Sequence, residues 1–165
     1  MARLPRIAPC LWFDGQAEAA AQFYTSVFDN SRILGLTRYG EAGRESHGQA
    51  PGTVMTVEFE LDGLAFTALN GIPAFHFTEA VSFQVHCDTK AEIDRYWAKL
   101  GEGGDPAAQQ CGWLKDRFGL SWQVVPSMLL ELFLKGDAER SERVMQALMP
   151  MKKLDIDALR SAWEG

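Results

Sequence analysis

Residues 111–126 have the sequence Cys-Gly-Trp-Leu-Lys-Asp-Arg-Phe-Gly-Leu-Ser-Trp-Gln-Val-Val-Pro. Two runs rich in aromatic and β-branched residues flank positions 116–119, where an aspartate and a glycine favour a chain reversal. Pro126 has no backbone N–H, so the second run cannot extend its pairing beyond it. The stretch therefore predicts a β-hairpin.

The second arm of the predicted hairpin has side chains of alternating character. Trp122 and Val124 share one face of such a strand and are expected to pack on a core. Ser121 and Gln123 share the other face, where they present a hydroxyl and an amide group. A polar strand face of this kind predicts a pocket on that side of the sheet.

The same stretch carries a family resemblance. Its pattern Cys-Gly-Trp-Leu-Lys-Asp-x-Phe-Gly-x-Ser-Trp-Gln-Val-Val-Pro resembles the signature of the PhnB-like family, within the vicinal-oxygen-chelate or glyoxalase-like superfamily. Many members of that family carry the description 3-demethylubiquinone-9 3-methyltransferase. The resemblance covers nearly the whole chain and implies a fold made of two βαβββ modules.

The chain upstream of the hairpin fits such a duplication. A first module is expected at residues 5–71, with strands at 7–13, 33–39, 53–61 and 64–70 and a helix capped by Asp14. Asp62-Gly63 is the strongest short-range hairpin signal in this module. A linker with Gly and Pro follows at 71–77.

A second module is expected at residues 79–126. It has a strand at 81–87, a helix that begins with the capping box Thr89–Glu92, a short strand near 107–110, and the hairpin. A helical tail follows at 127–165, with helices at 128–134, 137–149 and 155–163 that Gly136 and Pro150 separate. The predicted fold class is α+β, with duplicated βαβββ modules and a helical C-terminal tail in a single domain of 165 residues.

Composition excludes several classes of protein. The net charge of -6 and the scattered basic residues argue against nucleic acid as a partner. No apolar run approaches the roughly 20 residues that cross a bilayer, so no membrane partner is expected. Residues 1–6 precede no apolar segment, which predicts a cytoplasmic protein. Cys10, Cys87 and Cys111 show no Cys-x-x-Cys spacing and are expected to be free, mostly buried thiols.

The resemblance also implies where a metal ion would bind. In metal-dependent members of the superfamily, each module supplies a His or Gln from its first strand and a Glu from its last. Here strand alternation predicts that the inward side chains are Ala8, Cys10, Trp12, Ser82, Gln84 and His86, with Asn70 and Gln123 in place of the carboxylates. Only His86 is a strong ligand of a divalent metal, and a strand-end histidine hydrogen-bonded to a neighbour is the favoured interpretation over a metal ligand or a general base. We therefore predict no full metal site and no cofactor, while the superfamily leaves a divalent metal ion open.

The predicted function is to bind a small organic molecule, aromatic or apolar, in a cup between the two modules. Its expected ligand-binding residues are Cys10, Trp12, Asn70, Gln84, His86, Trp113 and Gln123, with the Trp113 indole placed to stack on a ring. The alternative is an enzyme, either metal-dependent and glyoxalase-like or the methyltransferase of the family description. No catalytic residue can be assigned, and the glycine-rich run at 101–104 follows a helix, where a nucleoside-binding turn would follow a strand.

The tail carries a further signal. Apolar side chains occur on both faces of the helix predicted at 128–134. A helix exposed on one side does not need such a pattern. We therefore expect a second subunit to cover it, in a homodimer.

Overall fold

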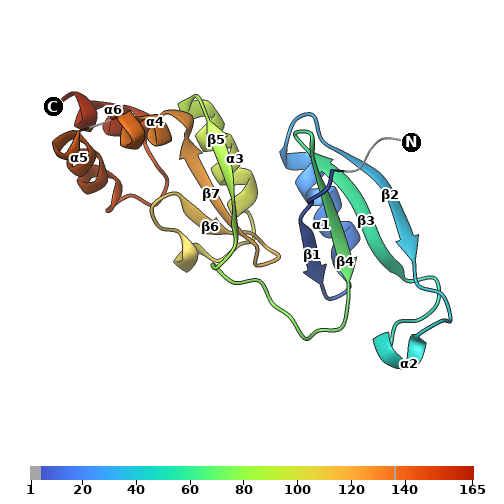
Figure 1. Ribbon diagram of the computed structural model, residues 1–165. Helices are drawn as coiled ribbons and strands as arrows, with labels where there is room; N and C mark the ends of the chain where they lie inside the picture. The colour runs from blue at the N-terminus through green and yellow to red at the C-terminus, as the bar shows by residue number, and fades with distance from the viewer. Residues whose placement is uncertain (1–4, 136) are drawn as a thin grey trace. The chain divides into compact units, whose positions relative to one another are not determined.

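The structure of the chain is a computed structural model that describes residues 5–135 and 137–165 (Figure 1). Residues 1–4, where no leader peptide is predicted, lie outside the described residues, as does Gly136 between two predicted helices. The chain divides into two compact units, Met1–His76 and Phe77–Gly165. The predicted modules thus belong to different units, and their union into a single domain stays a prediction.

The first unit is a four-stranded sheet with a helix on one face (Figure 1). Its strands are β1 (Cys10–Phe13), β2 (Arg32–Arg38), β3 (Val54–Leu61) and β4 (Leu64–Asn70), in the order β1-β4-β3-β2. β1 is parallel to β4, and the other neighbours are antiparallel. Helix α1 (Ala17–Val27) packs its buried Tyr24 near Phe59 of β3, and the loop between β2 and β3 contains the short helix α2 (Arg44–His47).

Helix α1 is capped from a distant strand. The predicted cap by Asp14 is wrong: the N-cap residue is Gln16, whose side chain makes no capping hydrogen bond. Instead, the backbone N–H of Ala17 donates to Oδ1 of Asn70 at 2.9 Å. The Asn70 amide also donates to the carbonyl of Val54 at 3.0 Å, so this buried side chain ties the start of α1 to the sheet.

The second unit repeats the topology with one strand fewer. Its sheet has the order β5-β7-β6, made of β5 (Ser82–Cys87), β7 (Ser121–Pro126) and β6 (Trp113–Lys115). As in the first unit, the first strand is parallel to the last, and a helix, α3 (Lys90–Gly101), connects the first strand to the rest of the unit. The predicted capping box is present, because Thr89 accepts from the N–H of Glu92 and the Glu92 carboxylate accepts from the N–H of Thr89.

The predicted hairpin is confirmed as β6 and β7. Asp116 at its reversal is 3% exposed and organises the turn. Its Oδ1 accepts from the N–H of Phe118 at 2.8 Å and of Leu120 at 3.1 Å, and its Oδ2 accepts from the indole Nε1 of Trp122 at 2.8 Å. One carboxylate therefore fixes both the turn and the orientation of a core tryptophan.

The short strand predicted near 107–110 is replaced by other structure. Residues Pro106–Ala108 form a 3-10 helix, with Asp105 accepting from the N–H of Ala107 at 2.8 Å. The N–H groups of Ala108 and Gln109 donate to the carbonyls of Asp105 and Pro106, so they are not available to a strand ladder. Only Gln110 pairs, in an isolated bridge with Trp113, so the described part of the second unit has a three-stranded sheet.

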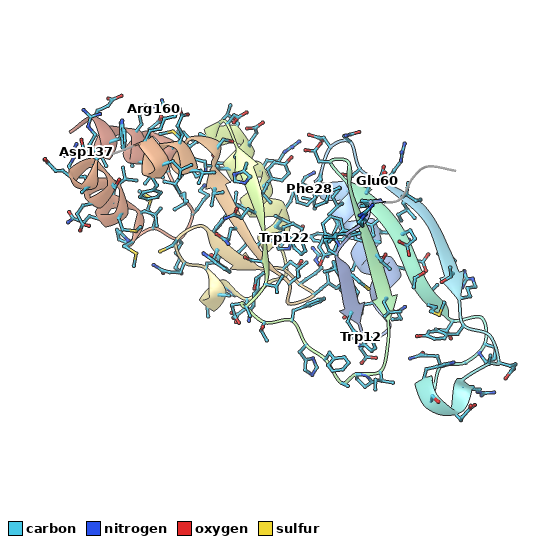
Figure 2. All side chains as sticks on the ribbon, viewed as in Figure 1. Trp12, Phe28, Glu60, Trp122, Asp137 and Arg160 are labelled. Atoms are coloured by element: carbon cyan, nitrogen blue, oxygen red, sulfur yellow. The ribbon has the colours of Figure 1, made fainter. Side chains whose placement is uncertain are left out.

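The tail folds into three helices, close to the predicted ranges. They are α4 (Ser127–Lys135), α5 (Ala138–Leu148), capped by Asp137 (Figure 2), and α6 (Ile156–Glu164), capped by Asp155. A buried cluster joins the tail to the end of β7 and consists of Val125, Val144, Leu148, Leu154 and Leu159. No helix in the described ranges has the length and apolar character to cross a membrane.

The segment between α5 and α6 is also tied to the sheet. The carbonyls of residues 151–152 accept from the N–H groups of Cys111 at 2.8 Å and Gly112 at 2.7 Å. Lys153 forms an ion pair with Asp94 of α3, and this cation lowers the pKa of the Asp94 carboxyl. The tail is therefore an integral part of the second unit.

The three cysteines differ in environment, although all are free thiols as predicted. Only Cys87 is buried, whereas Cys10 is exposed and Cys111 is half-buried, so the expectation that most are buried is wrong. Burial, followed by the carboxylates of Glu92 and Asp88, raises the pKa of the Cys87 thiol to about 12.

This raised pKa predicts a loss of stability at high pH. The protonated thiol makes its full contribution below the pKa of the unfolded chain, and that contribution is lost as the pH rises toward the pKa of the folded state. We expect urea denaturation of wild type and Cys87→Ala to give stability curves that converge from about pH 8 to about pH 11. Curves that stay parallel would show that this thiol titrates as it does in the unfolded chain.

Candidate functional site

The face of the second sheet opposite α3 presents three rows of side chains, which we call the open face. Strand register places Ser82, Ser121 and Lys115 in one row, Gln84, Gln123 and Trp113 in the next, and His86 and Val125 in the third. The alternate residues Val85, Trp122 (Figure 2) and Val124 are buried on the α3 side. Alternation along β5 and β7 thus separates a core face from a face available to ligands.

A cavity of about 290 Å³ lies over the second and third rows. Strands β5, β6 and β7 supply the polar residues and the indole of its wall, namely Gln84, His86, Trp113 and Gln123. The tail supplies most of the apolar wall, including Leu129, Phe133, Leu148 and Leu154. The structure therefore brings together four of the predicted site residues with apolar side chains that the sequence analysis did not assign to the site.

Hydrogen bonds hold the polar groups of this cavity in a chain. Gln123 donates through Nε2 to Oγ of Ser82 at 2.8 Å and accepts through Oε1 from Nε2 of Gln84 at 3.4 Å. This leaves the Gln84 carbonyl oxygen open to a donor. The imidazole of His86 makes no hydrogen bond to another described residue, unlike the neighbour-bonded histidine considered as an alternative.

Trp113 is positioned by a tight turn. Cys111 and Gly112 have φ angles of +52° and +83°, and the N–H of Trp113 donates to the carbonyl of Gln110 at 2.8 Å. Two successive positive φ values characterise the hairpin turns that match strand twist. The Cys-Gly pair of the signature therefore aims the following indole across the open face.

A second cavity, of about 380 Å³, adjoins the first. Trp113 and Cys111 line both cavities, and Ser121, Lys115 and Glu79 line only the second. The Lys115 ammonium lies 2.5 Å from a carboxylate oxygen of Glu79, and this hydrogen bond lowers the pKa of the Glu79 carboxyl. The charged end of this cavity is thus internally neutralised.

The other three predicted site residues belong to the first unit. Cys10 is exposed, and the Nε1 of Trp12 (Figure 2) donates to the carbonyl of Ile72 at 2.9 Å. The ring of Phe75 meets that of Trp12 edge-on, with centroids 5.1 Å apart. Asn70 was expected to face inward, but it is 3% exposed and caps α1.

One inward carboxylate escaped the sequence analysis. Glu58 of β3 lies on the face of the first sheet opposite the buried Val57 and Phe59, and its Oε2 accepts from the Thr67 hydroxyl at 2.6 Å. The family resemblance implies metal ligands on the first and last strands of a module, and β3 is neither. The alternation of residues 54–61 is the signal that would have found it.

The donor set of the second unit does not fit a divalent metal ion. Within residues 5–135 and 137–165, no three His, Cys, Asp or Glu side chains gather closely enough to hold one. The open face offers one imidazole and two amides beside the cavity, and zinc or manganese sites in proteins require more imidazole, thiolate or carboxylate ligands.

Solved structures resemble this chain over most of its length. A putative 3-demethylubiquinone-9 3-methyltransferase, the PhnB protein from Bacillus cereus, is 37% identical, with a TM-score of 0.62 over 74% of this chain and 99% of that one. Protein PA1353 from Pseudomonas aeruginosa is 23% identical, with a TM-score of 0.57 over 74% and 98%. The fosfomycin resistance protein FosX from Listeria monocytogenes, complexed with Mn(II) and sulfate, is 13% identical, with a TM-score of 0.51 over 82% and 98%.

The two small sheets, one in each unit, and the likeness to the PhnB protein define a protein of the vicinal-oxygen-chelate, or glyoxalase-like, class. The chain belongs to the 3-demethylubiquinone-9 3-methyltransferase family, or PhnB-like family, whose model matches residues 5–125. No curated protein matches the chain. The family match ends just before α4, so the helices that wall the first cavity lie beyond it.

Proposed function

We propose that this PhnB-like protein binds a small organic molecule on the open face of its second unit. The observation that carries the proposal is that Gln84, His86, Trp113 and Gln123, from three strands, line one cavity. Ligand sites in proteins are typically concave and mostly apolar, with a few convergent polar groups. This cavity has that composition.

The wall chemistry favours an aromatic or apolar ligand. The Trp113 indole offers a flat face for stacking, with an edge-to-face or offset geometry. The open carbonyl of Gln84 accepts, and the imidazole of His86 can donate or accept, depending on its tautomer. Such a site orients one polar group of a ligand and buries the remainder against apolar side chains.

A second candidate function is an enzyme that acts on a small molecule. Family membership favours it, either as the methyl transfer named in the family description or as metal-dependent chemistry of the glyoxalase type. Gly101 ends helix α3, so the glycine run at 101–104 lacks the strand-to-helix context of a nucleoside-binding turn. Turnover that rises on addition of Ni²⁺, Zn²⁺, Mn²⁺ or Fe²⁺ would favour the metal-dependent enzyme over the binding protein.

The tail supports assembly as a homodimer. None of the residues of α4 is buried, and Leu130 and Leu134 are 59% and 75% exposed. Exposed apolar side chains on one helix gain stability when a second subunit covers them. The subunit count in solution tests this part of the proposal.

Substitution of site residues tests the binding function. We expect His86→Ala and Gln123→Ala to weaken the binding of aromatic or apolar compounds about three- to tenfold each, because the first removes a hydrogen-bonding group and the second removes the acceptor that positions the Gln84 amide. Both side chains line an open cavity, so the melting temperature without ligand should change by less than about 2 °C. Compounds are identified by thermal shift on wild type and their affinities measured by calorimetry.

The matched control is Gln146→Ala, which removes an exposed glutamine from α5. Its affinity for the same compounds should equal that of wild type. A large loss of stability in His86→Ala or Gln123→Ala would show that these residues are structural, and unchanged affinity would place the ligand elsewhere.

A further inference from the structure

The open face of the second unit changes character along its length. Ser121 and Val125 both lie on it, four residues apart in β7, which corresponds to roughly 13 Å along a strand. The Ser121 end lies in the second cavity, and the Val125 end lies in the first, beside the tail. Because Trp113 and Cys111 line both cavities, the two cavities adjoin.

The polar end contains an unsatisfied hydroxyl. Ser121 is 1% exposed, and its Oγ has no hydrogen-bond partner among the described residues. Burying a hydroxyl without a partner is unfavourable, so native proteins rarely leave one unpaired. A hydroxyl that lines a cavity and lacks a partner indicates that another molecule supplies the hydrogen bond.

The apolar end is built by residues beyond the family match. Leu129 and Phe133 of α4, with Leu148 and Leu154, wall the first cavity. These side chains offer no hydrogen bonds, so they favour the apolar part of a ligand. The length and shape accepted at this end are therefore properties that the tail adds.

Neither end offers a free charge to a ligand. No Asp, Glu, Lys or Arg is among the described residues that line the first cavity. In the second, Lys115 is paired with Glu79 at 2.5 Å. Bringing an ionised group into such surroundings removes its hydration without supplying a counter-charge, which is strongly unfavourable.

We propose that the two cavities form one elongated site for an uncharged amphipathic molecule. Its hydroxyl or carbonyl group bonds to Ser121, and its apolar body crosses Trp113 to reach α4. This inference rests on the proposed binding function and assigns its ligand class and the tail residues that set specificity.

Primary alcohols test this ligand class. Calorimetry of the full chain with hexanol, octanol and decanol is expected to show affinity rising about two- to fourfold for each added methylene. Octyl phosphate should bind at least about tenfold more weakly than octanol, because it carries a charge that the site does not neutralise. Phe133→Ala should reduce the gain from octanol to decanol.

Ser121→Ala tests the polar end. We expect it to weaken octanol binding about three- to tenfold while leaving the melting temperature unchanged or higher, because the hydroxyl it removes is unpartnered. Ser161→Ala, which removes an exposed hydroxyl of α6, is the matched control and should bind octanol like wild type.

Two results would overturn the inference. Equal octanol affinity in Ser121→Ala and wild type would show that the ligand does not bond to Ser121. Affinity that does not depend on alcohol chain length would show that the ligand does not extend along the apolar wall. If aromatic compounds still bound with the expected sensitivity to Gln123→Ala, the proposed function would stand and only the ligand class would fail. If neither the alcohols nor any screened compound bound, both would fail.

Discussion

Replacing Asp116 with alanine is expected to lower the free energy of unfolding by about 3–5 kcal/mol. The substitution leaves the N–H groups of Phe118 and Leu120 and the indole N–H of Trp122 without their acceptor. Because Asp116 is 3% exposed, water cannot readily replace its carboxylate. Urea denaturation measures the loss directly.

The Asp116→Asn substitution separates the two roles of this carboxylate. The amide oxygen can still accept from the turn, but an NH₂ group would face the indole N–H, so we expect an intermediate loss. Adding Trp122→Phe removes that opposed donor, and the asparagine should then cost less than it does beside tryptophan. A loss below about 1 kcal/mol in Asp116→Ala would contradict the role assigned to this side chain.

Replacing Gly112 with alanine is expected to lower the free energy of unfolding by about 2–4 kcal/mol. Its φ is +83°, and an added Cβ would lie 3.0 Å from both a Leu154 methyl carbon and the carbonyl oxygen of Val124. Its N–H also donates to Lys152 of the tail. The substitution therefore strains the backbone and pushes the tail away from the hairpin.

Gly119→Ala is the matched control. Its φ of +84° is nearly the same, but an added Cβ there meets no atom within 4 Å. We expect Gly119→Ala to lower the free energy of unfolding by about 1–2 kcal/mol, which is the cost of the left-handed backbone conformation alone. Equal losses in the two variants, measured by urea denaturation, would mean that the tail does not pack closely on the hairpin.

Local patterns made much of the fold predictable. The turn residues and alternation of 111–126 gave the hairpin, and the spacing of Thr89 and Glu92 gave the start of α3. These features depend on neighbouring residues, whose chemistry is legible in the chain. The family resemblance supplied the superfamily.

Features that depend on distant contacts were not predictable in this way. Asp14 has the chemistry of a helix cap, yet Asn70 from another strand satisfies the first N–H of α1. The 3-10 helix at Pro106–Ala108 ends the strand pattern locally, although the sequence suggested a fourth strand. The cap of α1 is a case in which tertiary structure overrode a local preference, whereas at residues 106–108 one local structure replaced another.

The candidate site was predictable in part for the same reason. Gln84, His86 and Gln123 follow from alternation along their strands, and the Cys-Gly pair drew attention to Trp113. The apolar wall of the cavity was not predictable, because Leu129 and Phe133 reach the open face only through the packing of the tail. The amphipathic character of the site thus becomes visible only in the structure.

Native mass spectrometry of the purified protein, with elemental analysis of the same sample, tests the binding function most directly. It reports retained ligand, metal and subunit count together. We predict a dimer without a stoichiometric metal. We also predict that it retains an uncharged organic molecule, which collisional activation in the mass spectrometer releases. A stoichiometric divalent metal and no organic ligand would contradict this account and make a metal-dependent enzyme the leading hypothesis.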